Sequence, residues 1–136
     1  MKDLRSIART VVASVLVLGS AVTVEAGQRK DAFVVINSST RTASGSMGSA
    51  RQSSGSVQSI GCSVVYPPHS PQWGTCVATN SAGTTATCAF SSNGTGVWDL
   101  LSALGDDAYI TFKWSATGAC TSLEIQNYSY YMPKQN

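Results

Sequence analysis

The side chains that could do chemistry in this 136-residue chain are few and widely spaced. His69 is the only histidine, so a catalytic triad or a zinc site would have to depend on it. Metal sites usually need two or more histidine or cysteine ligands, and the chain has no G-x-S-x-G turn to present a nucleophilic serine. We therefore predict no catalytic residue, no metal site and no cofactor.

Glycoside hydrolysis needs two carboxylates held about 5–10 Å apart. Each candidate carboxylate also has an ordinary structural explanation, because aspartate is common in turns and in the first turn of a helix. No loop of alternating oxygen ligands suggests a calcium site. A carboxylate-dependent hydrolase is therefore the last of our three functional hypotheses. The candidates are Asp99, Asp106, Asp107 and Glu124.

The four cysteines are spaced 14, 12 and 32 residues apart and form no C-x-x-C pair. In an exported domain this pattern favours two disulfides over a zinc site. Three pairings are possible. We predict that Cys62 pairs with Cys76, which would close a proline-rich loop, and that Cys88 pairs with Cys120, which would enclose a helix.

Residues 1–26 have the features of a secretory signal peptide. Lys2, Arg5 and Arg9 precede a short apolar run at 11–18, and small residues lead to Ala26. The apolar run is too short to span a bilayer comfortably. We therefore expect a single domain at 27–136, secreted or periplasmic, without a membrane span and with a frayed tail at 133–136.

The charges argue against nucleic acid as a partner. Nine Lys and Arg oppose seven Asp and Glu, the net charge is +2, and the cations are dispersed. Neutralising a run of phosphates needs clustered cations. We expect a monomer whose partner is a glycan or a protein.

The first half of the domain contains two apolar segments separated by a Ser/Gly-rich stretch. We predict strands at 32–36 and 60–66, the second ended by prolines. The stretch at 37–59 could be a flexible linker or polar strands with a turn, and we favour the ordered alternative.

The second half predicts two hairpins with a helix between them. Strands at 75–80 and 84–90 flank a turn at 80–83. Apolar residues recur at helical spacing near 96–104, and Gly105 follows as a left-handed cap. The last hairpin joins 107–114 to 119–128.

The predicted register of the last hairpin places Trp114 opposite Ala119. Phe112 then faces Thr121, and apolar pairs gather on one face of the hairpin. This register puts Cys120 on the outer face, beside Lys113. Seven or so short strands and one helix predict a mainly β fold, a small antiparallel β-sandwich with two disulfides. A small α+β domain is the alternative.

Aromatic residues are the best candidates for binding a ligand. Flat rings with hydrogen-bonding neighbours suit sugar rings or a protein surface, although tyrosines also shield a sheet with their hydroxyls in water. Tyr109, Tyr128 and Tyr130 can share the outer face of the last hairpin, and Trp73 and His69 lie in the proline-rich loop.

Several segments together resemble small exported bacterial proteins that have two disulfides and no known activity. The segments are 48–53, 58–62, 109–114, 118–121 and 129–134. The resemblance covers most of the chain after residue 26. It implies an exported, disulfide-bonded domain and implies no role for any residue.

Three functional hypotheses follow. The first is a secreted, non-enzymatic binding domain for a glycan or a protein surface. The second is a secreted inhibitor or effector that presents the loop at 67–74, since prolines pre-organise a loop and lower the entropy cost of binding. The third is the hydrolase described above.

Overall fold

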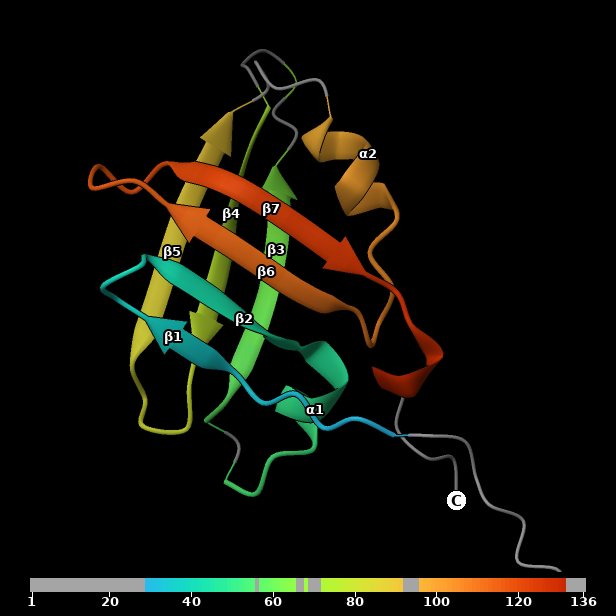
Figure 1. The fold of residues 1–136 in the computed structure, drawn as a ribbon. Helices are drawn as coiled ribbons and strands as arrows, with labels where there is room; N and C mark the ends of the chain where they lie inside the picture. Colours follow the sequence, from blue (N-terminus) through green and yellow to red (C-terminus); the bar gives the residue numbers. More distant parts are fainter. Residues whose placement is uncertain (1–28, 56, 66–67, 69–71, 92–95, 132–136) are drawn as a thin grey trace, which may run out of the picture.

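A computed structural model describes residues 29–55, 57–65, 68, 72–91 and 96–131, which form two antiparallel sheets packed face to face (Figure 1). Sheet A has the order β1-β2-β6-β7, and sheet B has the order β3-β4-β5. The strands of the two sheets cross steeply. The predicted mainly β fold with two disulfides is confirmed. The strands are β1 Val35–Asn37, β2 Thr42–Ser46, β3 Ser59–Val65, β4 Trp73–Thr79, β5 Thr85–Ser91, β6 Tyr109–Trp114 and β7 Cys120–Gln126.

The core lies between the sheets, and its largest side chains come from β6. Ile110 and Phe112 are fully buried. The residues that face them from sheet B are mostly small, and include the buried Ala78 and Ala86. Because small side chains leave room between the sheets, the ring of Phe112 fills the space that they do not occupy.

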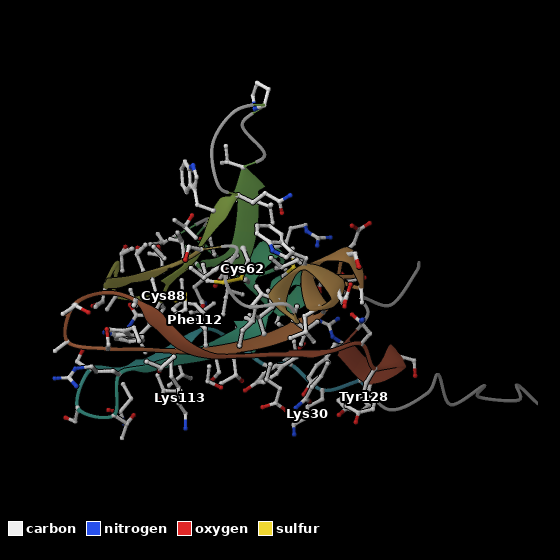
Figure 2. The ribbon with its side chains drawn as sticks, turned by 90° about the horizontal axis from the view of Figure 1, so that it is seen from above. Lys30, Cys62, Cys88, Phe112, Lys113 and Tyr128 are labelled. Carbon is white, nitrogen blue, oxygen red and sulfur yellow. A yellow bond between two sulfur atoms is a disulfide. The ribbon has the colours of Figure 1, made fainter. Side chains whose placement is uncertain are left out.

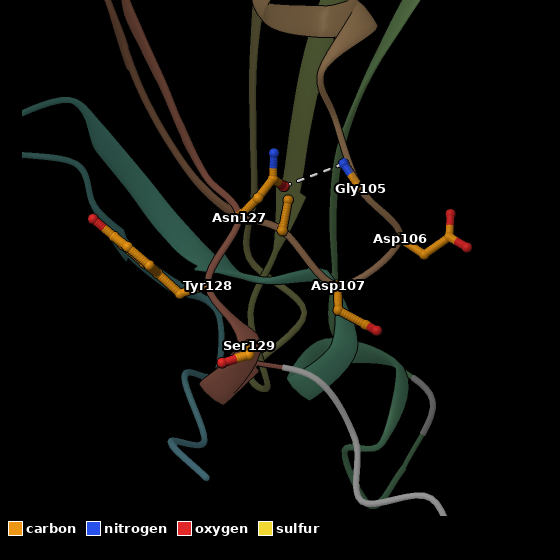
Figure 3. A pocket seen from close by; sticks show the side chains of 7 residues that line it. Gly105, Asp106, Asp107, Asn127, Tyr128 and Ser129 are labelled. Carbon is orange, nitrogen blue, oxygen red and sulfur yellow. Dashed lines mark hydrogen bonds between the residues drawn. The ribbon is translucent and has the colours of Figure 1, made fainter. Parts of the chain in front are cut away.

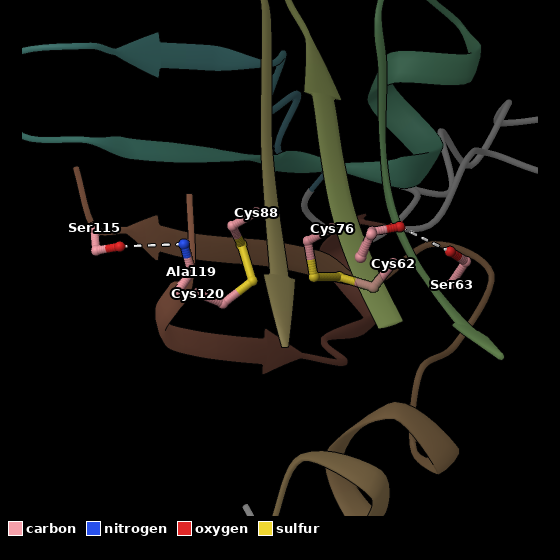
Figure 4. The surroundings of a disulfide bond; sticks show 8 residues. Cys62, Ser63, Cys76, Cys88, Ser115, Ala119 and Cys120 are labelled. Atoms are coloured by element: carbon pink, nitrogen blue, oxygen red, sulfur yellow. Dashed lines mark hydrogen bonds between the residues drawn. A yellow bond between two sulfur atoms is a disulfide. The ribbon is translucent and has the colours of Figure 1, made fainter. Parts of the chain in front are cut away.

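The two disulfides have different structural roles (Figure 4). Cys62 and Cys76 are directly opposite each other in β3 and β4, so their bond lies within sheet B. Cys88 of β5 is bonded to Cys120 of β7, which joins the two sheets. Both predicted pairings are confirmed, and two disulfides are consistent with an oxidising compartment. No helix among the described residues is both long and apolar enough to cross a membrane.

The predicted register of the β6–β7 hairpin is wrong by two residues at Phe112 and by one residue at Trp114. Phe112 pairs with Leu123 rather than Thr121, and Trp114 pairs with Cys120. Thr121 is an extra residue at a β-bulge, because Lys113 pairs with Ser122 while the next residue pairs with Cys120. The bulge turns Cys120 toward sheet B. Its predicted position on the outer face is therefore also wrong.

The described residues of the Ser/Gly-rich stretch at 37–59 are ordered, which is the alternative that the sequence analysis favoured. The stretch forms β2 and a helix that was not predicted, α1, at Met47–Arg51. The hydroxyl of Ser46 caps α1 by accepting a hydrogen bond from the backbone N–H of Ser49 at 3.3 Å. The Ser49 hydroxyl in turn accepts a bond from the backbone N–H of Ala32 at 2.9 Å. β1 consequently begins three residues later than predicted.

The predicted helix near 96–104 is present as α2, Val97–Ser102. Its cap is Ala103, and Gly105 does not adopt a left-handed conformation, so the predicted cap is wrong. The turn between β4 and β5 matches its prediction, since the side-chain oxygen of Asn80 accepts hydrogen bonds from the backbone N–H groups of Ala82 and Thr84 and Gly83 has a φ of 78°. The predicted signal peptide at 1–26 and tail at 133–136 lie outside the described residues.

Candidate functional site

Four tyrosines gather at the end of sheet A where β6 begins and β7 ends. Tyr109 is the first residue of β6. The other three follow β7, two of them in the short 3₁₀ helix η1, Ser129–Tyr131. We call this group the tyrosine cluster: Tyr109, Tyr128, Tyr130 and Tyr131.

The four rings contact one another in a continuous row. The ring of Tyr109 is stacked on that of Tyr131, with centroids 5.0 Å apart and an angle of 15° between the planes. Tyr128 is stacked on Tyr130 at 5.1 Å and 13°. The Tyr130 and Tyr131 rings are tilted at 59° with centroids 4.4 Å apart, and so connect the two stacked pairs. Burial runs from Tyr131, which is 6% exposed, to Tyr128, which is 53% exposed.

Hydrogen bonds from distant parts of the chain hold the segment that carries the cluster. The side chain of Asn127 accepts a bond from Gly105 N at 3.2 Å and donates one to Ala103 O at 2.6 Å. The backbone N–H of Lys30 donates to Tyr130 O at 2.9 Å. Gly48 lets α1 approach closely, since a Cβ there would lie 3.0 Å from Tyr131 O. The positions of the rings are therefore fixed before any ligand binds.

Tyr131 is the anchor of the cluster and differs chemically from its neighbours. Burial raises the pKa of Tyr131 from 10.0 to about 12, and the neighbouring Tyr130 hydroxyl adds to the shift. The neutral phenol is thus favoured in the folded protein.

Tyr131 should make the protein less stable in strong alkali. Its raised pKa contributes stability that is fully present below pH 10 and is lost as the pH rises through the folded value of about 12. Between pH 10 and pH 12, ionisation of Tyr131 should lower the free energy of unfolding by up to about 2–3 kcal/mol. Denaturant titrations at about pH 9 and about pH 12 would measure it. Tyr131→Phe should show a smaller decrease, and an equal decrease in both proteins would contradict the assignment.

The outer face of sheet A extends from the cluster as a polar surface. Tyr109 pairs with Gln126 across β6 and β7, and Thr111 pairs with Glu124 in the next row. Gln126 donates a hydrogen bond to the Glu124 carboxylate at 2.6 Å. Lys30, Lys113 and Tyr128 lie on this same side of the sheet (Figure 2). A ligand here would meet an exposed ring at one end and hydroxyl, amide and charged groups along the sheet.

A cavity of about 360 Å³ lies behind the cluster, between the loop 105–108 and the segment 127–129. Figure 3 shows that the side chains of Asp106 and Asp107 point away from the ring of Tyr128. Tyr128 is among the residues that line the cavity, and its ring extends to the side opposite Asp106 and Asp107. The cavity and the tyrosine cluster are therefore separate surfaces that share one backbone segment.

The carboxylates proposed for hydrolysis come from three parts of the chain: α2, the loop that holds Asp106 and Asp107, and β7. Asp107 is 3.4 Å from Arg51 Nη2, and its Oδ1 is buried without a hydrogen bond from any described group. Asp106 is exposed beside it. Asp99 belongs to α2, and Glu124 is occupied by its bond to Gln126. The ion pair gives Asp107 a structural role, and the hydrolase remains an untested hypothesis.

The other predicted ligand-binding residues lie apart from the tyrosines. Trp73 is 47% exposed on the outer face of sheet B, opposite Val65 of β3. His69 lies outside the described residues, as do residues 67, 70 and 71, so half of the loop at 67–74 is described. The structure thus brings the predicted tyrosines together and leaves Trp73 on the other sheet.

The four cysteines are all bonded in disulfides. Among the described residues, Cys76, Cys88 and Cys120 are the only group of three or more potential metal ligands that gather closely. All three are in disulfides. Their proximity follows from two neighbouring disulfides in one core, since Cys76 and Cys88 are opposite each other in β4 and β5.

Sequence reasoning did not include Tyr131 among the candidate residues. The signal that could have identified it is the spacing of three residues from Tyr128, which places two side chains on one face of a 3₁₀ helix.

Comparisons with protein-family models, with curated proteins and with solved structures found no match to this chain.

Proposed function

We propose that the domain is a non-enzymatic glycan-binding module that acts outside the cytoplasm, with the exposed ring of Tyr128 as its binding platform. The observation that carries the proposal is the combination of exposure and order at this ring. More than half of the Tyr128 residue is exposed. One face of its ring is nevertheless covered by Tyr130.

An ordered aromatic platform suits the apolar face of a sugar ring. The C–H groups of a pyranose pack against an aromatic face, while its hydroxyls remain available for hydrogen bonds. Tyrosine offers a large contact area with few rotatable bonds, so little conformational entropy is lost. Because Tyr128 is already stacked on Tyr130, the entropy cost of binding is lower still.

The groups beside the platform match the hydroxyls of a glycan. Thr111, Glu124 and Gln126 offer hydroxyl, carboxylate and amide groups on the same face of sheet A. The hydrogen bond between Gln126 and Glu124 orients both side chains. A glycan that extends from Tyr128 along β7 would meet these groups in turn.

A glycan fits this face better than a protein surface does. Protein interfaces usually have an apolar, fully buried centre surrounded by a polar rim. On the outer face of sheet A, the exposed apolar groups are Tyr128 at one end, Val35 on the edge strand β1 and Phe33 just before that strand. Polar residues occupy the rows between them. The arrangement is that of a platform with hydrogen-bonding neighbours.

Replacing Tyr128 with alanine should lower the affinity for a glycan about tenfold or more, the usual cost of removing an aromatic anchor. A glycan array would first identify a ligand for the wild-type protein, and calorimetry would then compare the variants. Tyr128→Phe keeps the platform and should bind nearly as well as the wild type. Trp73→Ala is the matched control, because it removes an exposed ring from the other sheet.

Three outcomes would refute the proposal. The wild type could bind no sugar on the array, Tyr128→Ala could bind as well as the wild type, or Trp73→Ala could be the variant that loses binding. Protease inhibition without sugar binding would instead support a secreted inhibitor that uses the loop at 67–74.

A further inference from the structure

Sheet B belongs to a long segment of the chain that carries no charge. Between Arg51 and Asp99 there is no Asp, Glu, Lys or Arg. All three strands of sheet B come from this segment. About a quarter of the residues of a typical globular domain are charged, and charged residues are depleted where proteins contact one another. The composition of sheet B is therefore that of a covered surface.

The outer face of sheet B is suited to being covered. Its exposed apolar side chains are Val65, Trp73 and Val77. The hydroxyls between them are partly paired with one another. Ser63 bonds to Thr75 at 3.1 Å, and Thr79 bonds to Thr85 at 3.1 Å. Since these hydroxyls already have partners, removing water from them costs less free energy than it otherwise would.

Three of the four sheet edges among the described residues are protected in recognised ways. β1 has only three residues. β7 has the bulge at Thr121 and the charged Glu124, and bulges and charges both discourage pairing with another strand. The edge of β5 is occupied where Ala89 donates a backbone hydrogen bond to Gly118.

The fourth edge, β3, packs against α1, but in the described part of the chain no second strand, bulge or charge protects it. It runs for seven residues without a charge, a proline or a bulge. Among the described residues, its backbone makes hydrogen bonds only to β4. Ser63, Val64 and Val65 are exposed. Beside this edge, a groove of about 320 Å³ lies on the outer face of sheet B, over Gly61 of β3 and Thr75 and Val77 of β4. A Cβ added at Gly61 would meet nothing within 4 Å. An open edge of this kind is a template for another strand.

We propose that β3 pairs antiparallel with β3 of a second copy of this chain, extending sheet B across a two-fold axis into a six-stranded sheet. Antiparallel pairing about a two-fold axis lets the same N–H and C=O groups of each copy satisfy each other. No like charges would meet across the axis, because neither strand carries one. This dimer would replace the monomer expected from the sequence, and its surface is separate from the tyrosine cluster.

The test is the mass of the purified protein in solution as a function of concentration. In sedimentation equilibrium, the average mass should rise from that of the monomer toward twice that value. The association should persist at high salt, because screening weakens only charged contacts. Amide hydrogen exchange of β3 should slow as the dimer forms, while exchange in β1 and β7 should not change.

Ser63→Lys should weaken the dimer about tenfold or more, because lysines on an edge strand oppose strand pairing and both copies would carry the new charge on the paired strand. Val35→Lys is the matched control. It places the same charge on the exposed edge strand β1 of sheet A and should dimerise like the wild type. Circular dichroism would show that both variants are folded.

If the average mass stayed that of the monomer at every concentration, the proposal would be overturned, and a strand of another protein would become the candidate partner of the β3 edge. Equal weakening by Ser63→Lys and Val35→Lys would overturn it too, as would slowed exchange at β1 or β7 in place of β3.

Discussion

Replacing Phe112 with alanine is expected to lower the free energy of unfolding by about 3–5 kcal/mol, the usual cost of removing a buried phenylalanine. The ring is fully buried between the sheets. Its neighbours in sheet A are Ala43 of β2 and Leu123 of β7. A small residue such as alanine cannot move into the space that the ring leaves, so a cavity should remain. Urea titration followed by circular dichroism would measure the loss.

Lys113→Ala is the matched control, because it changes the next residue of the same strand. Lys113 is exposed on the outer face of sheet A, so its removal should change the free energy of unfolding by no more than about 0.5 kcal/mol. Phe112→Leu should be less destabilising than alanine and would keep the measurement possible if the alanine variant does not fold. A loss below about 1 kcal/mol for Phe112→Ala would mean that the ring does not fill the core.

Replacing Cys88 and Cys120 together with alanine should be the second most damaging change. The chain-entropy model gives about 3.7 kcal/mol for a bond across this sequence separation of 32 residues. Loss of the buried Cys88 side chain adds to that cost. This bond is also the covalent connection between the two sheets. Thermal and urea unfolding of the double variant would show the decrease.

The double variant that lacks Cys62 and Cys76 provides the comparison. Its bond spans a sequence separation of 14 residues, for which the same model gives about 3 kcal/mol. It also connects neighbouring strands that pair without it. We expect the smaller loss here, and the reverse order would contradict the structural role assigned to the Cys88–Cys120 bond.

The periodicity of the sequence predicted the faces of the strands better than their partners. Ile110 and Phe112 point into the core, as alternation along β6 required. From Phe112 toward the start of β6, the register with β7 was wrong by two residues, and a slip of two keeps each side chain on the same face. At Trp114 the register was wrong by one residue, and there Cys120 lies on the face opposite to the predicted one. Hydrophobic alternation therefore excludes a register that is shifted by one residue, but it cannot distinguish between registers that differ by two residues. The bulge at Thr121 is a feature of the pairing between two strands, so the sequence of one strand does not indicate it.

Helix α1 was missed because its stability depends on other parts of the chain. It has five residues, and isolated helices of that length do not form in water. Its cap, Ser46, is one of many serines in a Ser/Gly-rich stretch. The contacts that hold α1 reach the backbone of Ala32 and of Asp106, and neither was visible from local sequence.

The candidate site was predicted in part. Tyr109, Tyr128 and Tyr130 were expected on the outer face of the last hairpin, and the structure joins them in one cluster. Tyr131, which connects and anchors them, depends on the 3₁₀ helix that follows β7. The separation of Trp73 from the cluster follows from which sheet each strand joins, and the sequence alone does not determine that.

The hydrogen bond between Lys30 N and Tyr130 O places the two ends of the described domain side by side. A mechanical force that pulled these ends apart would therefore peel the first segment from η1 one bond at a time, instead of shearing whole strands at once. Further unravelling would stop at the disulfides, which enclose 14 and 32 residue steps. Roughly 150 Å of extended chain would stay locked. Under tension the two terminal segments would separate at low force, and the part of the chain that the disulfides enclose would remain unextended.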